Sequence, residues 1–259
     1  MRQIVIGLGE IGQPLLNILQ RTYQNVKGYD SANGTPPLLS ADILHICIPY
    51  SDKFIAAVKT YQKLYTPTVT VIHSTVPVGT TNKINNAVHS PVLGSHKHME
   101  RDIQGFGKWI GGEKAEIVAQ VFRLAQIRCR VVAKPEQTEL MKLMCLAKYG
   151  VIIAFAHYQR EVCEELDINP EDLMEWDLDY NLGVEPRLRR PLIYLTDKQI
   201  GGHCVIPGVE MLKADYPHEL LEGVIKHGAP QRSGGFPRSR VQVSPPDECM
   251  GATLHWQGD

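Results

Sequence analysis

Three glycines stand at the spacing of a ligand-binding turn close to the start of the chain. Gly7, Gly9 and Gly12 follow an apolar run and precede a stretch in which apolar residues recur at helical spacing. A strand-to-helix turn uses one glycine for its tight bend, one for close approach of the backbone to a ligand, and one for helix packing. The N–H groups at the helix start then face an anion. The pattern predicts a dinucleotide site, with Glu10 and Ile11 in the same turn.

A carboxylate follows the next apolar run and specifies the dinucleotide. Asp30 lies eighteen residues after Gly12, at the end of the segment Gly28-Tyr29-Asp30. A carboxylate at this place hydrogen-bonds the ribose hydroxyls and repels a 2′-phosphate. We therefore expect NAD rather than NADP. The alternative is a glycine-rich turn that binds FAD or S-adenosylmethionine.

Short apolar runs alternate with amphipathic stretches through the first half of the chain. The predicted strands are 3–6, 26–29, 43–48, 69–73, 108–110 and 130–132, and the predicted helices are 11–23, 54–65, 81–87 and 114–125. Strands that alternate with helices indicate a doubly wound parallel sheet. The fold class is thus α/β, with a Rossmann domain over residues 1–133.

The pattern changes after residue 133 to a long central helix and a small helical domain over 134–226. Apolar residues recur at intervals of three or four from Pro135 to about Leu166, and Asn169 with Pro170 marks the start of a further helix. A helix of about thirty residues spans ~45 Å and buries poorly against one small sheet. We therefore expect a homodimer formed through this helix. Residues 227–259 are rich in Gly, Pro and Ser, which predicts a disordered tail.

Composition excludes several classes of protein. The net charge of -1 argues against a nucleic-acid binder, and the longest uninterrupted apolar runs are too short to span a membrane. The predicted strand starts at once, which leaves no room for a signal peptide. The six cysteines have no CxxC spacing, so we expect a reducing cytoplasmic location without a disulfide scaffold or a zinc site.

Four ordered segments carry a family resemblance. Residues 74–81 (STVPVGTT), just after a predicted strand, resemble the UDP-glucose/GDP-mannose dehydrogenase family. Segment 41–49, which precedes this string, and segment 139–143, which follows it, match two further motifs of that family in the same order. Segment 200–204 (IGGHC) resembles its cysteine nucleophile motif, in the form seen in the UDP-N-acetylmannosamine dehydrogenase type. The resemblance covers roughly residues 1–215.

The resemblance implies an NAD-dependent oxidation of a nucleotide-sugar alcohol. Cys204 would attack the aldehyde made by a first hydride transfer, and the thiohemiacetal would give a second hydride before hydrolysis. Lys142 would orient a water and stabilise the oxyanion. The remaining residues that it implies are Thr75 and His203 for catalysis, and Pro49, Ser74 and Thr75 beside the cofactor.

Departures from the family surround the implied nucleophile. Val92 stands where the family has a glutamate, and Leu146 where it has an asparagine. No aspartate follows Cys204 at the family's spacing, and the family's C-terminal nucleotide-sugar-binding domain has no counterpart in this sequence. We therefore expect an intact cofactor half in a short form of the family. Oxidation by two electrons and by four both stay open.

Two other functions remain alternatives. The first is a β-hydroxyacid-type dehydrogenase, which has the same domain and long helix but works with Lys142 and no cysteine. The second is a non-catalytic NAD-binding derivative. The non-catalytic alternatives are that Cys204 is a small buried apolar residue and that Lys142 is a solvated helix residue.

Other polar and thiol groups have less specific interpretations. The arginines at 187, 189 and 190 could bind a substrate phosphate or form a solvated loop. We expect Cys47 and Cys145 in the apolar core because they lie on apolar patterns. His96 and His98 lie in a polar loop without carboxylate partners, so we expect no metal there.

Overall fold

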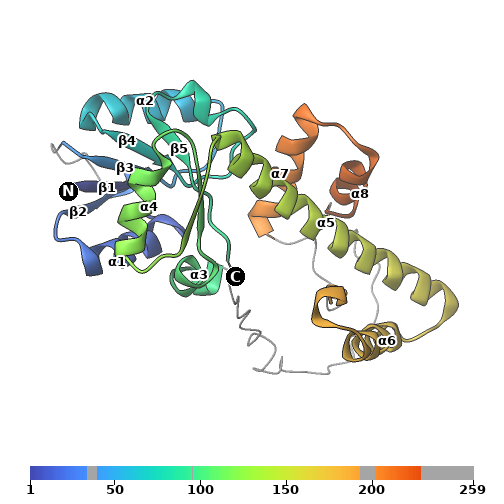
Figure 1. Cartoon of the computed structure of the whole chain (residues 1–259). Helices are drawn as coiled ribbons and strands as arrows, with labels where there is room; N and C mark the ends of the chain where they lie inside the picture. The colour runs from blue at the N-terminus through green and yellow to red at the C-terminus, as the bar shows by residue number, and fades with distance from the viewer. Residues whose placement is uncertain (34–39, 95, 193–201, 229–259) are drawn as a thin grey trace.

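The computed structural model describes residues 1–33, 40–94, 96–192 and 202–228, and a seven-stranded sheet forms the first half (Figure 1). The strands lie in the order β2-β1-β3-β4-β5-β6-β7. The strands are β1 (Gln3–Ile6), β2 (Val26–Tyr29), β3 (Ile43–Ile46), β4 (Val69–Ile72), β5 (Ala87–His89), β6 (Lys108–Gly111) and β7 (Cys129–Val132). The predicted Rossmann α/β class is confirmed. One expectation is wrong: β6 pairs antiparallel to β5, so the sheet is not wholly parallel.

Helices cover both faces of this sheet. α1 (Gly12–Thr22), α3 (Met99–Phe106) and α4 (Ala115–Leu124) pack on one face, in a core with Val5, Val71 and Val88. α2 (Phe54–Tyr65) packs on the other, against Ile4 and Ile46. Because central strands are buried on both faces, they consist of nearly continuous apolar residues.

Two local predictions differ from the structure. Residues 81–87 do not form a helix: the short 3-10 helix η2 (Thr81–Lys83) leads into β5, and Asn86 turns with a φ of 51°. The unexpected α3 follows the 3-10 helix η3 (His96–His98). Met99 and Ile103 are buried and lie four residues apart, so they anchor α3 on one face.

The second half is helical, as predicted. α5 (Pro135–Leu166) leaves the sheet, α6 (Pro170–Gly183) packs at its far end, and α7 (Gly202–Asp215) and α8 (Glu219–Gly228) lie along it (Figure 1). Asn169 caps α6 by accepting from the Glu171 N–H at 3.2 Å. A Cβ on Gly150 would lie 2.6 Å from Val224, so this glycine allows the close approach of α8.

The first two residues of the tail expected at 227–259, His227 and Gly228, belong to α8, and residues 229–259 lie outside the described part. Two further 3-10 helices complete the described structure, η1 (Ser31–Asn33) and η4 (Pro186–Leu188).

α5 is the one helix in the described residues that is long and apolar enough to cross a membrane by length and composition. The core helix of a soluble protein passes the same test, and α5 packs on α7, α8, β5 and β6. Outside these contacts it exposes large apolar residues, namely Leu140, Met141, Met144, Tyr149, Phe155 and Tyr158.

Candidate active site

Most of the predicted site residues gather at one edge of the sheet. The register aligns Ile6 with Tyr29 and with Ile46, and Ile46 with Ile72. The glycine turn, Asp30, Pro49 and Ser74–Thr75 follow these four strand ends. In open α/β sheets, ligands bind in the crevice at this carboxyl edge.

The glycine turn has the geometry that its sequence predicts. Gly7 has a φ of +87°, and a Cβ there would lie 2.8 Å from the Cys47 carbonyl oxygen. A Cβ on Gly12 would lie 1.7 Å from the Gly7 carbonyl oxygen, so no larger residue fits. A Cβ on Gly9 would meet nothing within 4 Å, and Ile11 gives α1 no side-chain cap. The exposed turn and uncapped helix start thus fit a pyrophosphate.

Asp30 is tied to this turn. Its Oδ2 accepts from the Leu8 N–H at 2.8 Å and its Oδ1 accepts from the Ala32 N–H at 3.1 Å. These two bonds, that from Leu8 first, hold the pKa of Asp30 below its ordinary value. A carboxylate has about four lone-pair sites, so two remain for ribose hydroxyls.

A buried glutamate holds the loop that follows β4. Glu139 of α5 is fully buried and accepts from the N–H groups of Gly79 and Thr81 at 2.6 and 2.8 Å, and from the Thr81 hydroxyl at 2.6 Å. Burial raises its pKa, and the bonds from Thr81 and Gly79 oppose that rise. Glu139 belongs to a motif of the resemblance, but its part as the anchor of segment 74–81 depends on contacts across 58 residues of chain.

His89 supports the start of the same loop. Its Nε2 lies 3.1 Å from the Ser74 carbonyl oxygen and its Nδ1 lies 2.8 Å from the Thr138 hydroxyl. A carbonyl only accepts, so Nε2 carries the proton and Nδ1 accepts from Thr138. Burial lowers the pKa of His89 to about 3, which keeps the ring neutral. The Ser74 hydroxyl itself donates to the Ile48 carbonyl at 2.5 Å.

Lys142 lies at the same edge, one turn after Glu139. Its Nζ donates to the Val92 carbonyl oxygen at 3.0 Å. Burial lowers its pKa, and the nearby thiols of Cys145 and Cys204 oppose that effect. The structure therefore places Lys142 within electrostatic reach of Cys204. The residue in place of the family's glutamate contributes only its main-chain oxygen to Lys142.

Cys204 of α7 is half-buried beside Lys142. Burial raises the pKa of its thiol, Lys142 lowers it, and Glu10 of the glycine turn raises it again. Leu146 packs in the same apolar cluster as Cys204, where the family has a polar side chain. The thiol is thus neutral at pH 7 in this arrangement. His203 also belongs to α7, but its side chain lies outside the described residues.

An apolar pocket of about 270 Å³ opens beside Lys142. Trp109 of β6 and Met141 of α5 line it, together with Cys145. Cys145 is exposed, so its predicted core position is wrong: on α5 it faces away from the α7–α8 cluster. Cys47 does pack against the sheet core, where burial raises its pKa to about 12.

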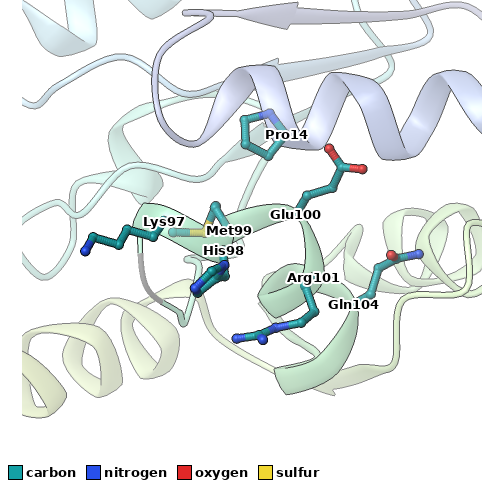
Figure 2. Close-up of a pocket in the computed structure, with 7 residues that line it drawn as sticks. All are labelled: Pro14, Lys97, His98, Met99, Glu100, Arg101 and Gln104. Carbon is teal, nitrogen blue, oxygen red and sulfur yellow. The ribbon is translucent and has the colours of Figure 1, made fainter. Parts of the chain in front are cut away.

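A more open hollow of about 520 Å³ lies between the start of α1 and α3. Figure 2 shows Lys97, His98 and Arg101 on one side of it and Pro14 of α1 on the other. None of the candidate cofactor or catalytic residues lines it.

The arginine cluster lies elsewhere. Arg187 pairs with Glu185, and Arg190 stacks 3.7 Å from the centre of the Tyr180 ring. These contacts hold the cluster near α6, at the end of α5 that points away from the sheet (Figure 1). Within one chain, the structure does not bring Arg187 or Arg190 to Lys142.

A buried polar row crosses the sheet beneath the site, and the sequence interpretation missed it. Gln3, His45, His73 and Lys108 are each at most 2% exposed. They come from β1, β3, the residue after β4, and β6. His45 interrupts an apolar run, whereas Gln3, His73 and Lys108 stand at the ends of theirs.

Comparison with known proteins agrees with this architecture. No protein-family model matches the chain, and no curated protein matches it in sequence. Among solved structures, a UDP-D-ManNAc dehydrogenase of Pyrococcus horikoshii superposes with a TM-score of 0.75 at 19% identity, over 88% of this chain and 68% of that one. The chain has the fold of the nucleotide-sugar dehydrogenases.

Two further structures show the range of the likeness. A UDP-glucose dehydrogenase of Pyrobaculum islandicum has a TM-score of 0.65 at 15% identity, over 88% of this chain and 67% of its own. A conserved protein of unknown function, described as similar to 3-hydroxyacid dehydrogenases, has a TM-score of 0.64 at 15% identity. The match covers 88% of this chain and 95% of that protein. The structural neighbours therefore include nucleotide-sugar dehydrogenases and a protein described as similar to 3-hydroxyacid dehydrogenases.

Proposed function

We propose that the protein is an NAD-dependent oxidoreductase acting on the CH–OH group of a sugar-like substrate, with a nucleotide sugar as the best candidate. The observation that carries this proposal is the convergence of the glycine turn, Lys142 and Cys204 at the carboxyl edge of the sheet. Glu10 of the turn is close enough to act on the Cys204 thiol. The solved relatives named above are the second support.

The residues of the chain would divide the work as follows. The α1 start and the Gly9 backbone would hold the pyrophosphate, and Asp30 would accept from the ribose hydroxyls. When bound, NAD supplies the hydride acceptor. Lys142 would stabilise the developing oxyanion of the substrate. Cys204 would add to the aldehyde carbon once it loses its proton, and the thiohemiacetal would then give up a second hydride to a second NAD. Water would hydrolyse the thioester left by that oxidation, which releases the acid and the Cys204 thiol.

NAD binding is tested at Gly9. A valine there meets no chain atom near its Cβ, so the fold should persist while the side chain fills the space of the pyrophosphate. We expect Gly9→Val to weaken NAD binding about 100-fold or more, measured by calorimetric titration. Gly105→Val, another glycine with open space around its Cβ, is the control and should bind as the parent does. Equal NAD affinity in all three proteins would contradict the assignment.

A second candidate function is favoured by the neutral thiol of Cys204. A β-hydroxyacid-type dehydrogenase needs the lysine but no cysteine, and burial raises the pKa of Cys204 among apolar neighbours. The protein of unknown function with 3-hydroxyacid dehydrogenase similarity supports this candidate at the level of fold.

Two substitutions separate the candidates in an NADH-absorbance screen over nucleotide sugars and hydroxy acids. We expect Lys142→Met to reduce turnover about 100-fold or more under both. Cys204→Ala should stop acid formation under the first proposal and leave full turnover under the second. No NADH with any substrate, together with intact NAD binding, would favour the non-catalytic derivative.

We also propose a homodimer in which α5 packs against its counterpart. Its exposed apolar residues would be buried by a second copy. Sedimentation should give twice the chain mass of 29.0 kDa, and Phe155→Glu should shift the protein toward monomer because Phe155 is 58% exposed on α5. Ile117→Glu, on the exposed side of α4, should leave the mass unchanged. A parent protein that sediments as a monomer at micromolar concentration would refute the dimer.

A further inference from the structure

The buried polar row beneath the site forms a continuous chain of contacts. Gln3 Oε1 lies 3.0 Å from His45 Nε2, and His45 Nδ1 lies 3.1 Å from His73 Nε2. His73 Nδ1 lies 3.0 Å from Lys108 Nζ. Every ring nitrogen therefore faces a neighbour in the chain. Because each neutral imidazole carries one N–H and one lone pair, the proton on one ring determines the proton on the next.

With Lys108 protonated, one arrangement gives every N–H of Lys108 and of the two rings an acceptor. In it the lone pairs of His73 Nδ1 and the Ser90 carbonyl oxygen lie 2.9 Å apart, and the ammonium that contacts both atoms offsets their repulsion. The ammonium has three N–H groups, and three acceptors surround it: His73 Nδ1, the Ser90 carbonyl at 2.5 Å and the Pro91 carbonyl at 2.9 Å. His73 must then carry its proton on Nε2 and donate to His45 Nδ1. His45 must carry its proton on Nε2 and donate to Gln3 Oε1.

With Lys108 neutral, the opposite arrangement is equally complete. The amine donates to the two carbonyls and offers a lone pair to His73, which must now carry its proton on Nδ1. His73 Nδ1 also lies 2.9 Å from the Ser90 carbonyl, a second acceptor for that proton. His45 then donates from Nδ1, and its bare Nε2 needs a donor from Gln3.

Gln3 has the freedom to supply that donor. Its Nε2 is buried and makes no hydrogen bond, so a half-turn of the amide would place this group against His45 Nε2. The atom left without a partner would then be an oxygen, and an unpaired carbonyl is tolerated better than an unpaired N–H. The orphaned amide nitrogen is thus an observation, separate from the row of contacts, that points to a second arrangement.

We propose that Gln3, His45, His73 and Lys108 form a buried two-state proton chain, in which loss of one proton to solvent reverses every hydrogen bond from Lys108 to Gln3. Each histidine keeps one proton, which changes from Nε2 to Nδ1. The net change is one proton and one positive charge, with no oxidation or reduction.

The surroundings of Lys108 determine the pH at which the hydrogen bonds of the proton chain reverse. The titratable groups that interact with it are the histidines His73, His45 and His89, the thiols of Cys47 after β3 and Cys129 on β7, and Lys142 on α5. No carboxylate of the described residues is among them. Burial therefore lowers the pKa of Lys108 to about 7. His45 and His89 face His73, and burial keeps both rings neutral there.

The proton chain contacts the candidate site through segment 90–92. Lys108 holds the first two carbonyls of this segment and Lys142 holds the third. The charge on Lys142 also disfavours the charge on Lys108. For the function proposed above, the state of the proton chain would thus be linked to the lysine that touches the substrate through the carbonyls of this segment.

The test is a pH titration of the full chain labelled with ¹⁵N-histidine and ¹³C-lysine, followed by two-bond ¹H–¹⁵N correlation. It needs no catalytic activity, so its failure and a failure of the proposed function are distinguishable. Between about pH 5.5 and about pH 9, His45 and His73 should both change from Nε2–H to Nδ1–H. Lys108 should titrate with the same midpoint. His89 is the internal control, because its Nε2 faces the Ser74 carbonyl and its Nδ1 faces the Thr138 hydroxyl rather than a lysine, so its proton should stay on Nε2.

Variants sharpen the outcome. Lys108→Met leaves the Ser90 carbonyl as the partner of His73 Nδ1, so both rings should stay Nδ1–H at every pH. Lys27→Met, on the exposed side of β2, should titrate as the parent does. Unchanged tautomers in the parent, or a change that persists in Lys108→Met, would overturn the proposal. If Lys108→Met does not fold, midpoints for Lys108 and the two rings that differ by more than about one pH unit would overturn it.

Discussion

Lowering the pH from 7 to about 5 is expected to unfold much of the protein. Burial lowers the pKa of His45 and His89 to about 3 and holds that of His73 well below its ordinary value. Between about pH 6.5 and about pH 3 the unfolded chain therefore binds protons that the native chain does not, so stability present above pH 6.5 is lost as the pH falls. At pH 5 this costs about 2 kcal/mol per histidine, against a total of about 5–15 kcal/mol.

The measurement is the free energy of unfolding in urea, followed by circular dichroism at several pH values. The side chain in His89→Gln can keep both hydrogen bonds but does not titrate. The slope of its unfolding free energy against pH should therefore be smaller than that of the parent by the equivalent of about one proton. His98→Gln, at an exposed ring, should keep the parent slope. Lys108 contributes little to the change in stability below its pKa, and Asp30 contributes only at lower pH. Glu139, with its raised pKa, is one group whose protonation favours the folded state as the pH falls. A free energy of unfolding that stays flat from pH 7 to pH 5 would refute the prediction.

Removal of the Glu139 carboxylate is expected to cost about 3 kcal/mol of stability and to loosen the loop after β4. Glu139→Ala leaves the N–H groups of Gly79 and Thr81 buried without an acceptor, and each such group carries a desolvation penalty of ~1–3 kcal/mol. Urea unfolding measures the first effect, and faster amide exchange at Gly79 and Thr81 measures the second.

The matched control for this change is Glu136→Ala. Glu136 lies one turn earlier on α5 and accepts from the Asn82 side chain in a more exposed position. Its loss should cost less than about 1 kcal/mol. Equal costs for the two variants would show that Glu139 is not the anchor of the loop.

The sequence predicted the elements whose signals are local. The turn from Gly7 to Gly12 lies between a strand and a helix, and α5 has an apolar residue at every third or fourth position. Both patterns can be recognised from residues that are close together in the sequence. The direction of β6 was missed because no local pattern distinguishes a parallel from an antiparallel strand. The exposed place of Cys145 was missed because apolar residues continue around most of α5.

The contacts that hold the site could not be predicted because sheet register makes them. His45 and His73 meet 28 residues apart, and Lys108 reaches His73 across a further 35. In sequence, His45 is a single polar residue inside an apolar run, and His73 and Lys108 stand at the ends of theirs. Such positions fit a strand end or a solvent-facing side chain equally well. Only the order of the strands places them in one row.

The double attachment of Asp30 constrains how this protein could change its cofactor. The carboxylate that would turn away a 2′-phosphate also fixes the Leu8 N–H, so one side chain serves selectivity and loop shape together. A neutral or basic replacement would remove the repulsion and release the turn in the same step. A lineage that adopts NADP would therefore need a second acceptor for Leu8 first, which makes the order of mutations, and not only their number, the barrier to the switch.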